Sequence, residues 1–219
     1  MPDDDAPRLT RKGRATRARI IDAAARLMFT RGIAGTSIDD VRGAAAVSGS
    51  QISHYFEDKR DLTRNVINLR RDNVRDFHAR PQLGGLDTLA SLDAWVQAVL
   101  ADLDPVYRQG GCIFGSLAGE LVEADVHVHR DLADGYDQWI ELFRNGLTAM
   151  RDHGELRPDA DPRHLAVTLV AAHQGGALLT FVADDPEPLR NALTAAVEYV
   201  RSFAARPKRR RSGPDKRTR

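Results

Sequence analysis

Apolar side chains recur along this chain at the three- and four-residue spacing of α-helices. The first clear stripe falls within residues 14–31 and comprises Ile20, Ile21, Ala24, Leu27, Met28 and Phe29. Residues three and four apart share one face of a helix, so this segment predicts an amphipathic helix. Gly32 follows the stripe and is expected to end the helix.

A short second helix and a very short third helix are predicted directly afterwards. Thr36 and Ser37 are typical N-cap residues for the second helix. Its buried face is expected to consist of Ile38, Val41, Ala44 and Ala45. After a tight turn, a third helix over residues 50–56 would keep Ile52 and Phe56 inward.

Longer helical patterns fill the rest of the chain. Asp58 is expected to cap a fourth helix from Lys59 to about residue 79, and the Pro- and Gly-containing segment 81–85 then breaks the chain. The further predicted helices cover about residues 86–103, 113–124, 128–150, 162–182 and 187–203. No segment shows the strict alternation of a half-buried strand. The sequence therefore predicts an all-α fold.

Residues 36–59 have the pattern of a helix-turn-helix unit. The side chains left on the outer face of the third helix are Ser50, Gln51, Ser53, His54 and Tyr55. They are short and form hydrogen bonds, so they could reach base edges and phosphates from a helix in the major groove. The same pattern also fits a compact three-helix unit with an ordinary polar face.

Composition indicates the size of the core and the cellular compartment to expect for this fold. Hydrophobic residues make up 42% of the 219 residues, which is enough for a sizeable core. The single cysteine, Cys112, excludes an internal disulfide framework and fits a reducing compartment. No stretch approaches the roughly 20 apolar residues of a membrane span, and the N-terminus lacks the apolar run of a signal peptide. The chain is therefore expected to be cytoplasmic.

The net charge is only +1, but the basic residues gather at both ends. Those near the N-terminus are Arg8, Arg11, Lys12, Arg14, Arg17 and Arg19. A second cluster lies within residues 206–219. Basic segments attract phosphates through counterion release, although solvated tails are an equally ordinary use of such charges.

The first helix and the helix-turn-helix unit together resemble the TetR (tetracycline repressor) family. Besides the first apolar stripe, the match consists of Gly35, Thr36, Ser37, Ile38, Val41, Ala44, Ala45, Val47, Ser48, Ile52, Tyr55, Phe56, Lys59 and Leu62. The resemblance implies that Thr36, Ser48, Tyr55 and Lys59 hold the phosphate backbone of DNA. It also implies that Gly49, Ser50, Gln51 and His54 face base edges. The resulting DNA-binding candidates are Arg14, Thr36, Ser37, Ser48, Gly49, Ser50, Gln51, Ser53, His54, Tyr55 and Lys59.

Two positions depart from the pattern that is usual in this family. Ala46 stands where the family often has glycine in the turn, and a right-handed backbone conformation is expected to accommodate it. Ser53 replaces a frequent tyrosine, so one usual contact with the DNA backbone would be lost or shortened.

The resemblance also implies a domain organisation and a mode of action. The implied parts are a flexible basic arm (1–13), a three-helix helix-turn-helix DNA-binding domain (14–58), a C-terminal helical ligand-binding and dimerisation domain (59–205) and a disordered basic tail (206–219). Regulators of this kind are homodimeric repressors that bind a palindromic double-stranded operator. They leave it when a small apolar or aromatic inducer binds, and no cofactor is expected.

The last two helices are expected to form the dimer interface. The penultimate helix carries a stripe of Leu165, Leu169, Ala172, Gly176 and Leu179. The last helix carries Leu189, Leu193, Ala196, Val200 and Phe203. Both stripes could instead be buried within their own domain. The interface is favoured because one recognition unit reads too few bases, whereas a two-fold dimer spans half-sites about 34–36 Å apart.

Residues 111–121 and 173–181 resemble a subgroup of these regulators similar to the LmrA/YxaF type. The candidate ligand-binding residues are Trp95, Phe114, Leu117, Tyr136, Trp139, Phe143, His173 and Gln174. Apolar and aromatic walls with few polar groups suit a small-molecule site. Each of these residues is equally typical of an ordinary helical core.

Other chemistry finds little support in the sequence. His127 and His129 suggest a metal site with Asp125 and His153, but residues two apart on a helix point to different faces. Cys112 could be a nucleophile or redox sensor, although a lone cysteine is more often a small buried residue. No phosphate-binding loop, nucleophile elbow or dinucleotide motif is present, so an enzyme is not expected. The open alternatives are a ligand-independent DNA-binding regulator or activator and, less readily, a small-molecule enzyme.

Overall fold

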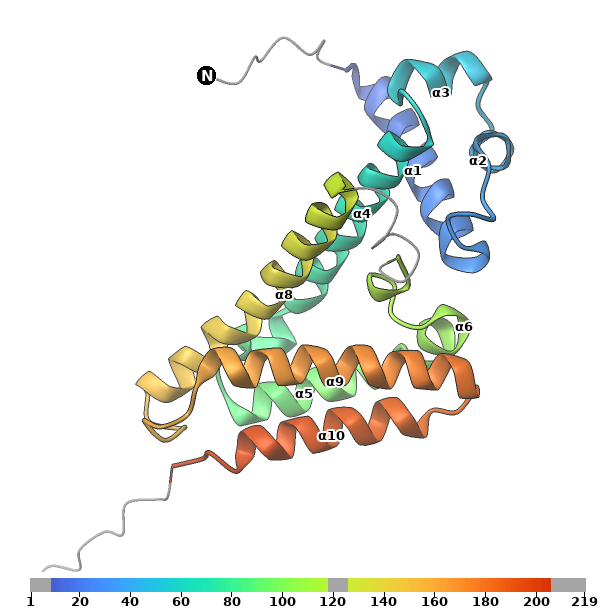
Figure 1. The fold of residues 1–219 in the computed structure, drawn as a ribbon. Coiled ribbons are helices and arrows are strands. Elements are labelled where there is room, and N and C mark those ends of the chain that lie inside the picture. Colours follow the sequence, from blue (N-terminus) through green and yellow to red (C-terminus); the bar gives the residue numbers. More distant parts are fainter. Residues whose placement is uncertain (1–8, 118–125, 206–219) are drawn as a thin grey trace, which may run out of the picture.

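The computed structural model describes residues 9–117 and 126–205 (Figure 1). These residues form helices joined by turns, and they contain no β-strand beyond an isolated bridge between Leu156 and Ala204. The all-α prediction is confirmed. Residues 1–8 and the basic tail at 206–219 lie outside the described part of the chain.

Three helices at the N-terminus form the unit at the top of Figure 1. They are α1 (Arg11–Arg31), α2 (Ile38–Ala45) and α3 (Gly49–Tyr55). α1 begins before the predicted residue 14, because the Thr10 side chain caps it by accepting a hydrogen bond from the backbone N–H of Gly13. The segment 11–13, expected in the flexible arm, is therefore helical.

The core of this unit contains most of the predicted apolar positions, although Leu27, Phe29 and Ile38 are only half-buried. Its buried side chains include Ile20, Ile21, Ala24, Met28, Val41, Ala45, Ile52 and Phe56. Ala44, expected on the buried face of α2, is exposed. A helix as short as α2 buries a single narrow face, and Val41 and Ala45 occupy it.

α4 (Lys59–His78) connects the N-terminal unit with the rest of the molecule. It begins at the predicted residue because the Asp58 carboxylate accepts a hydrogen bond from the backbone N–H of Asp61. α4 contacts both α1 and α8 (Val126–Asp152), and in Figure 1 α4 and α8 run diagonally through the molecule. A movement of α4 would therefore be transmitted directly to the N-terminal unit.

The C-terminal body contains three further long helices in the lower part of Figure 1. They are α5 (Leu89–Ala101), α9 (Pro162–Ala183) and α10 (Glu187–Arg201). Shorter helical segments precede and follow α5, namely η1 (Pro81–Leu86), η2 (Leu103–Tyr107) and α6 (Arg108–Gly110). α5 begins later than predicted because Thr88 caps it and Leu86 has a positive φ of 59°. Of the helix expected over 113–124, the first two residues form a turn and 118–125 lie outside the described part.

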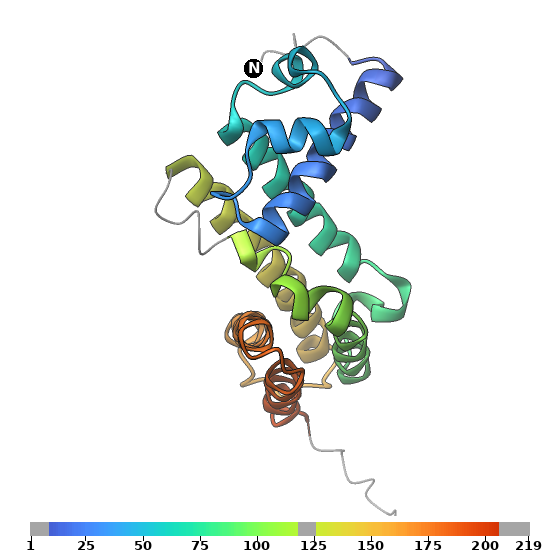
Figure 2. The ribbon, with the colours of Figure 1, turned by 90° about the vertical axis from the view of Figure 1, so that its right-hand side faces the viewer.

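α9 and α10 pack against each other, and Figure 2 shows them end-on. The apolar stripes expected to form a dimer interface are largely buried within the chain, at Leu165, Leu169, Gly176, Leu189, Leu193, Ala196 and Val200. A Cβ atom on Gly176 would lie 2.9 Å from the Cα atom of Leu189, so glycine permits this close approach. The prediction is therefore wrong for these residues, because each helix already covers the stripe of the other.

Leu179 of the predicted stripe remains exposed on α9, together with four apolar side chains outside that stripe. Val167, Leu178, Leu179, Phe181 and Val182 are between 41% and 73% exposed. α9 is thus apolar on its outer face as well as its inner face, and its most apolar window has a mean hydropathy of 1.6. The expectation that no segment approaches the apolar length of a membrane span is therefore wrong for α9. Within the chain, 44% of that window is buried. A helix that is apolar all round is typical of one covered on more than one side.

Candidate DNA-binding surface and ligand cavity

The start of α3 is fixed by a reciprocal capping box. The Ser48 hydroxyl accepts a hydrogen bond from the backbone N–H of Gln51 (3.2 Å), and the Gln51 side-chain oxygen accepts one from the backbone N–H of Ser48 (2.8 Å). Gln51 thus uses its oxygen within the protein, and its amide NH₂ group is left to meet a base edge. A two-point contact between Gln51 and adenine would require this cap to open.

The outer face of α3 is polar, as the sequence predicts. The exposed residues are Gly49, Ser50, Gln51, Ser53 and His54. The Ser53 hydroxyl donates a hydrogen bond to the backbone carbonyl of Gly49 (3.2 Å), so it stays close to the helix. A Cβ atom on Gly49 would meet no other atom within 4 Å, and this end of α3 is therefore open to a large partner.

Tyr55 lies half-buried where α3 meets the first turn of α1. Its hydroxyl oxygen is 3.4 Å from the position of a Cβ atom on Gly13, and its ring packs edge-on against His54 with centroids 4.8 Å apart. Arg11 and Lys12 are exposed on that same first turn of α1. The phenol therefore lies against a helical turn that also carries two exposed cations, and phenol and cation groups both suit contact with phosphates. The basic N-terminal cluster in the sequence includes Arg11 and Lys12. Only the fold shows that the helical turn carrying them lies beside Tyr55.

The other basic side chains of α1 differ in what they contact. Arg14 is exposed and donates a hydrogen bond to the backbone carbonyl of Leu9 (2.6 Å). Arg17 is hydrogen-bonded to Asn65 of α4, and Arg19 donates to the Ala45 carbonyl at the end of α2 (2.9 Å). Arg17 and Arg19 therefore hold the unit together, whereas Arg14 is accessible to DNA.

Three of the predicted DNA-binding residues lie near the starts of α2 and α4. Ser37 is exposed and caps α2, and its hydroxyl and N–H groups lower the pKa of Asp40 below its ordinary value. Thr36 is only 1% exposed and donates its hydroxyl to the Gly32 carbonyl (2.8 Å). Its predicted contact with a phosphate is therefore wrong for the side chain, because that group is buried and already bonded. Lys59 is half-buried in the first turn of α4.

The turn between α2 and α3 contains a residue in the left-handed region. Ala46 has φ 50° and ψ 54°, and its backbone N–H is hydrogen-bonded to carbonyls at the end of α2. The expected right-handed conformation is therefore wrong. The turn reverses the chain immediately after a helix, which is where a left-handed residue is commonly required.

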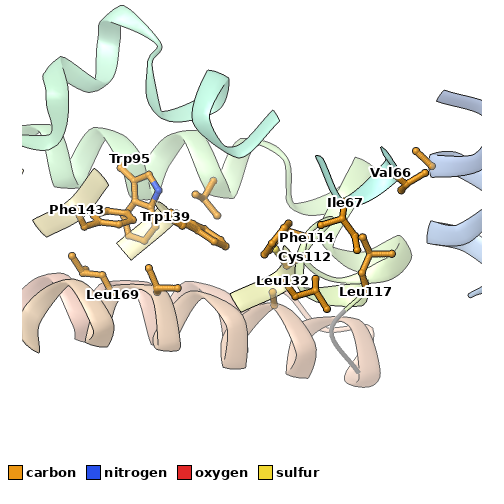
Figure 3. Packing of buried hydrophobic residues seen from close by; sticks show 14 of the residues in the cluster. Val66, Ile67, Trp95, Cys112, Phe114, Leu117, Leu132, Trp139, Phe143 and Leu169 are labelled. Atoms are coloured by element: carbon orange, nitrogen blue, oxygen red, sulfur yellow. The ribbon is translucent and has the colours of Figure 1, made fainter. Parts of the chain in front are cut away.

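A cavity of about 390 Å³ lies below α4 in the C-terminal body. Of the predicted ligand-binding residues, Trp95, Phe114, Trp139 and His173 line it. Figure 3 shows Trp95, Trp139 and Phe143 gathered at one end of the core, with Cys112 and Phe114 toward Ile67 and Val66 of α4. Aromatic walls around a hollow of this size are typical of a small-molecule site.

The other four predicted ligand-binding residues do not line this cavity. Phe143 packs edge-on behind Trp95 (centroids 4.9 Å apart), and Tyr136 packs in the same way against Phe114 (4.9 Å). Gln174 donates a hydrogen bond to the Cys112 sulfur (3.3 Å), and Leu117 is 1% exposed. Their helical spacing placed them in the core without showing which side of it is hollow.

Sequence reasoning missed several residues of the cavity wall. They include Arg70, Phe77 and His78 from α4, and Tyr107 and Cys112 from the segment around α6. The α4 residues carry no local signal, because an arginine, a phenylalanine and a histidine near the end of a long helix have many ordinary uses.

Two neutral histidines contribute polar groups to the cavity wall. The Nδ1 atom of His78 is 2.7 Å from the Val74 carbonyl, and its Nε2 atom accepts a hydrogen bond from the indole N–H of Trp139 (3.2 Å). The His173 Nε2 atom lies 2.7 Å from the Tyr107 hydroxyl. Burial lowers the pKa of His78 to about 4 and that of His173 to about 3, so both rings are uncharged near neutral pH.

The lone cysteine has the environment of a structural residue. Cys112 is 8% exposed, and burial raises its pKa above the ordinary value. A thiol that resists ionisation is a poor nucleophile. Within residues 9–117 and 126–205, no group of three or more His, Cys, Asp or Glu side chains could hold a metal ion.

The cavity is connected to α1 through two contacts. The Arg70 guanidinium donates a hydrogen bond to the Ala25 carbonyl (2.6 Å) and lies over the Phe29 ring (5.3 Å to the centroid). Gly110 of α6 lies under the same ring, because a Cβ atom there would be 2.5 Å from Phe29 Cζ. Tyr107 and Cys112 flank Gly110 in sequence and line the cavity, so a change in the cavity can reach α1 from both sides.

Comparison with known proteins separates the chain into the same two parts. Residues 20–66 match "Bacterial regulatory proteins, tetR family", and residues 88–196 match "Tetracyclin repressor-like, C-terminal domain". The HTH-type transcriptional repressor DhaR of Mycobacterium sp. (strain GP1) is 25% identical over 185 residues, which cover 84% of this chain and 91% of that protein. The HTH-type transcriptional repressor KstR2 of Rhodococcus jostii (strain RHA1) is 25% identical over 145 residues, covering 66% and 70%.

Solved structures agree with this assignment. A TetR transcriptional regulator from Chloroflexus aurantiacus J-10-FL has a TM-score of 0.78 and 26% identity, and the match covers 89% of this chain and 98% of that one. The regulatory protein TetR from Rhodobacter sphaeroides shares the fold, with a TM-score of 0.76, 21% identity and coverage of 84% and 98%. These relatives are regulators rather than enzymes, as expected. The chain belongs to the TetR family of DNA-binding transcriptional regulators.

Proposed function

We propose that this chain is a cytoplasmic, homodimeric repressor that a small molecule releases from a palindromic operator. The observation that carries the proposal is the shared wall between cavity and DNA-binding unit, where Arg70 lines the cavity and also binds the Ala25 carbonyl of α1. A ligand that changes this wall can change the position of α1, and α3 packs in the same unit as α1.

The outer face of α3 is proposed to enter the major groove. Ser50, Gln51 and His54 would face base edges, while Ser48 and Tyr55 would hold phosphates. Arg11, Lys12 and Arg14 add positive charge along the adjoining start of α1, which supports attraction to the DNA backbone.

The exposed apolar face of α9 supports the proposal of a homodimer. TetR-family regulators act as dimers, and contiguous exposed apolar side chains on a protein surface mark an interaction site. A two-fold axis across α9 would bury the same face on both subunits. It would also set the two copies of α3 at a fixed spacing, as a palindromic operator requires.

Release is proposed to follow from a difference in ligand affinity between two arrangements of α4 and α1. One arrangement spaces the α3 helices for adjacent major grooves, and the ligand-bound arrangement does not. A coupling free energy of about 1–3 kcal/mol between the two sites would change operator affinity by roughly 5–150-fold. The ligand needs no chemical reaction to act in this way.

The test of DNA recognition is selection of genomic fragments by the purified protein at about 150 mM salt, followed by affinity measurement on the selected fragment. The double variant with Gln51→Ala and Tyr55→Phe is expected to lose at least tenfold in affinity for that fragment while keeping its oligomeric state. The matched control is Arg26→Ala, an exposed change on α1. A protein that selects no fragment, or whose double variant binds like the control, would disprove the proposed surface.

A further inference from the structure

Arg70 is a buried cation without a counter-charge among residues 9–117 and 126–205. Its side chain is 7% exposed, its Nη2 atom donates to the Ala25 carbonyl, and its Nε atom has no hydrogen-bond partner in the described part of the chain. None of the described residues supplies a carboxylate to this guanidinium. Burial without such a partner lowers the Arg70 pKa to about 10. Charged side chains are almost never buried unpaired, because removal from water strongly disfavours an isolated charge.

Two more buried polar atoms of the same cavity lack a partner among the described residues. They are the indole Nε1 of Trp95 and the Nδ1 atom of His173. Unsatisfied buried polar groups are rare, and several around one hollow indicate a missing hydrogen-bonding partner. The wall also contains the aromatic side chains of Phe77, Phe114 and Trp139.

The other charged groups of the wall differ from Arg70 in exposure. Asp76 and Arg80 are exposed, with Asp76 paired to Arg75 (3.5 Å) and Arg80 lying over the Phe77 ring (4.4 Å). Asp102 is half-buried. Arg70 is therefore the buried charge in the described wall, and a ligand that enters fully would meet positive charge at that point.

We propose that the cavity takes an aromatic carboxylic acid whose carboxylate pairs with Arg70. A planar guanidinium binds a carboxylate through two parallel hydrogen bonds, and the Nε–H group has the free donor for one of them. The aromatic body would lie between Trp95, Trp139 and Phe114, and the Trp95 N–H group would bind a second polar atom of the ligand. This inference rests on the proposed function for the role of the cavity as the inducer site.

The same pairing explains how the ligand would act on DNA binding. The guanidinium that binds the carboxylate is the one that holds the Ala25 carbonyl of α1. A carboxylate is a stronger acceptor than a neutral carbonyl, so the ligand would draw Arg70 away from α1. The contact between α4 and the DNA-binding unit would then loosen when the acid binds.

The experiment compares acids with their uncharged amides at pH 7.5. Trp95 and Trp139 are the two tryptophans of the chain and both line the cavity, so intrinsic fluorescence reports on this site directly. The probes are 2-naphthoic acid and 4-biphenylcarboxylic acid, each beside its primary amide. We expect each acid to bind the wild-type protein at least tenfold more tightly than its amide. Equal binding of acid and amide to the wild-type protein would overturn the inference without any variant.

Substitutions then identify which cation causes the preference for the acid over its amide. Arg70→Met is expected to remove the preference for acids while leaving the affinity for amides within about threefold. Arg71→Met is the matched control, because Arg71 is the next residue of α4 and does not line this cavity. A preference that survives Arg70→Met, or that disappears with Arg80→Met instead, contradicts the assignment. If Arg70→Met does not fold, Arg70→Lys must weaken the acid preference, since lysine cannot reproduce the two-point contact.

The two proposals can fail separately. If acids bind through Arg70 and leave operator affinity unchanged, the ligand assignment holds and ligand-induced release is wrong. If the amides bind as tightly as the acids and still release DNA, release holds and the carboxylate assignment is wrong.

Discussion

Ala46 ends α2 with φ 50° and ψ 54°, a conformation that a Cβ atom makes unfavourable. Ala46→Gly is therefore expected to stabilise the protein by up to about 1 kcal/mol, because glycine removes this clash. The measurement is the free energy of unfolding in urea. Ala44→Gly, an exposed change inside α2, is the control and is expected to destabilise by about 1 kcal/mol. If Ala46→Gly destabilises the protein as Ala44→Gly does, the turn is not strained.

His78 and His173 predict a pH dependence of stability. Burial lowers their pKa values to about 4 and about 3, while the unfolded chain takes up protons near pH 6.5. The stability that each neutral ring contributes is therefore full above pH 6.5 and is lost as the pH falls toward about 4 for His78 and about 3 for His173. The slope is at most about 1.4 kcal/mol per pH unit for each histidine.

Urea unfolding at pH 7 and pH 5 measures this loss. Asparagine can still donate a hydrogen bond to the Val74 carbonyl in place of His78 Nδ1. His78→Asn should therefore lose less stability between the two pH values than the wild-type protein does. His153→Asn changes an exposed histidine and should leave the difference unaltered. If His78→Asn retains the wild-type pH dependence, the neutral buried ring is not its source.

At the scale of elements, α9 carries the proposed dimer face. Leu178→Glu combined with Val182→Glu is expected to give monomers at micromolar concentration, because an interface cannot bury four unpaired carboxylates around its axis. Both residues are exposed within one chain, at 60% and 73%, so the fold should persist. Sedimentation equilibrium and helical circular dichroism measure the two effects.

Ala101→Glu is the control for the α9 double variant, since it adds a charge on an exposed residue of α5. It should remain dimeric. A wild-type protein that is monomeric under these conditions, or a double variant that stays dimeric, would rule out α9 as the interface.

The contact of α6 with α1 makes a second prediction at this scale. Gly110→Ala would place a Cβ atom 2.5 Å from the Phe29 ring, so α6 must shift away from α1. Overpacking of this kind is expected to destabilise by about 1–3 kcal/mol. Gly43→Ala, where a Cβ atom meets nothing within 4 Å, should be neutral or stabilising.

A smaller side chain at position 29 provides the complementary test of that contact. Phe29→Leu should recover part of the stability lost in Gly110→Ala, because it removes the atoms that clash. Urea unfolding of the single and double variants gives this interaction energy. Additive effects of the two changes would show that Gly110 and Phe29 are not in contact.

Across the whole molecule, features that depend on neighbouring residues were easier to predict from the sequence than features that depend on residues far apart in the chain. Asp58 and Ser37 cap their helices as expected because a cap needs only a side chain and the next turn of backbone. The core of the N-terminal unit also followed from apolar spacing. Stripes on α9 and α10 were correctly identified as apolar, but spacing cannot show whether a buried face packs within one chain or between two.

The cavity was the least predictable part of the candidate site. Its wall combines α4, α5, α8, α9 and the segment around α6, which are far apart in the sequence. Phe143 and Trp139 share one helical stripe, yet only Trp139 lines the hollow. Arg70 is significant because it is buried and no described residue pairs it with a carboxylate, and neither fact can be read from the sequence.

The most direct test of the central claim is operator affinity measured by fluorescence anisotropy across a titration of a cavity-binding ligand. The wild-type protein is expected to lose roughly 5–150-fold in affinity as the ligand saturates the cavity. Val106→Phe, which fills part of the cavity from a half-buried position, should bind the operator normally and respond less. A ligand that saturates the tryptophan signal while wild-type operator affinity stays constant would contradict the coupling between cavity and DNA.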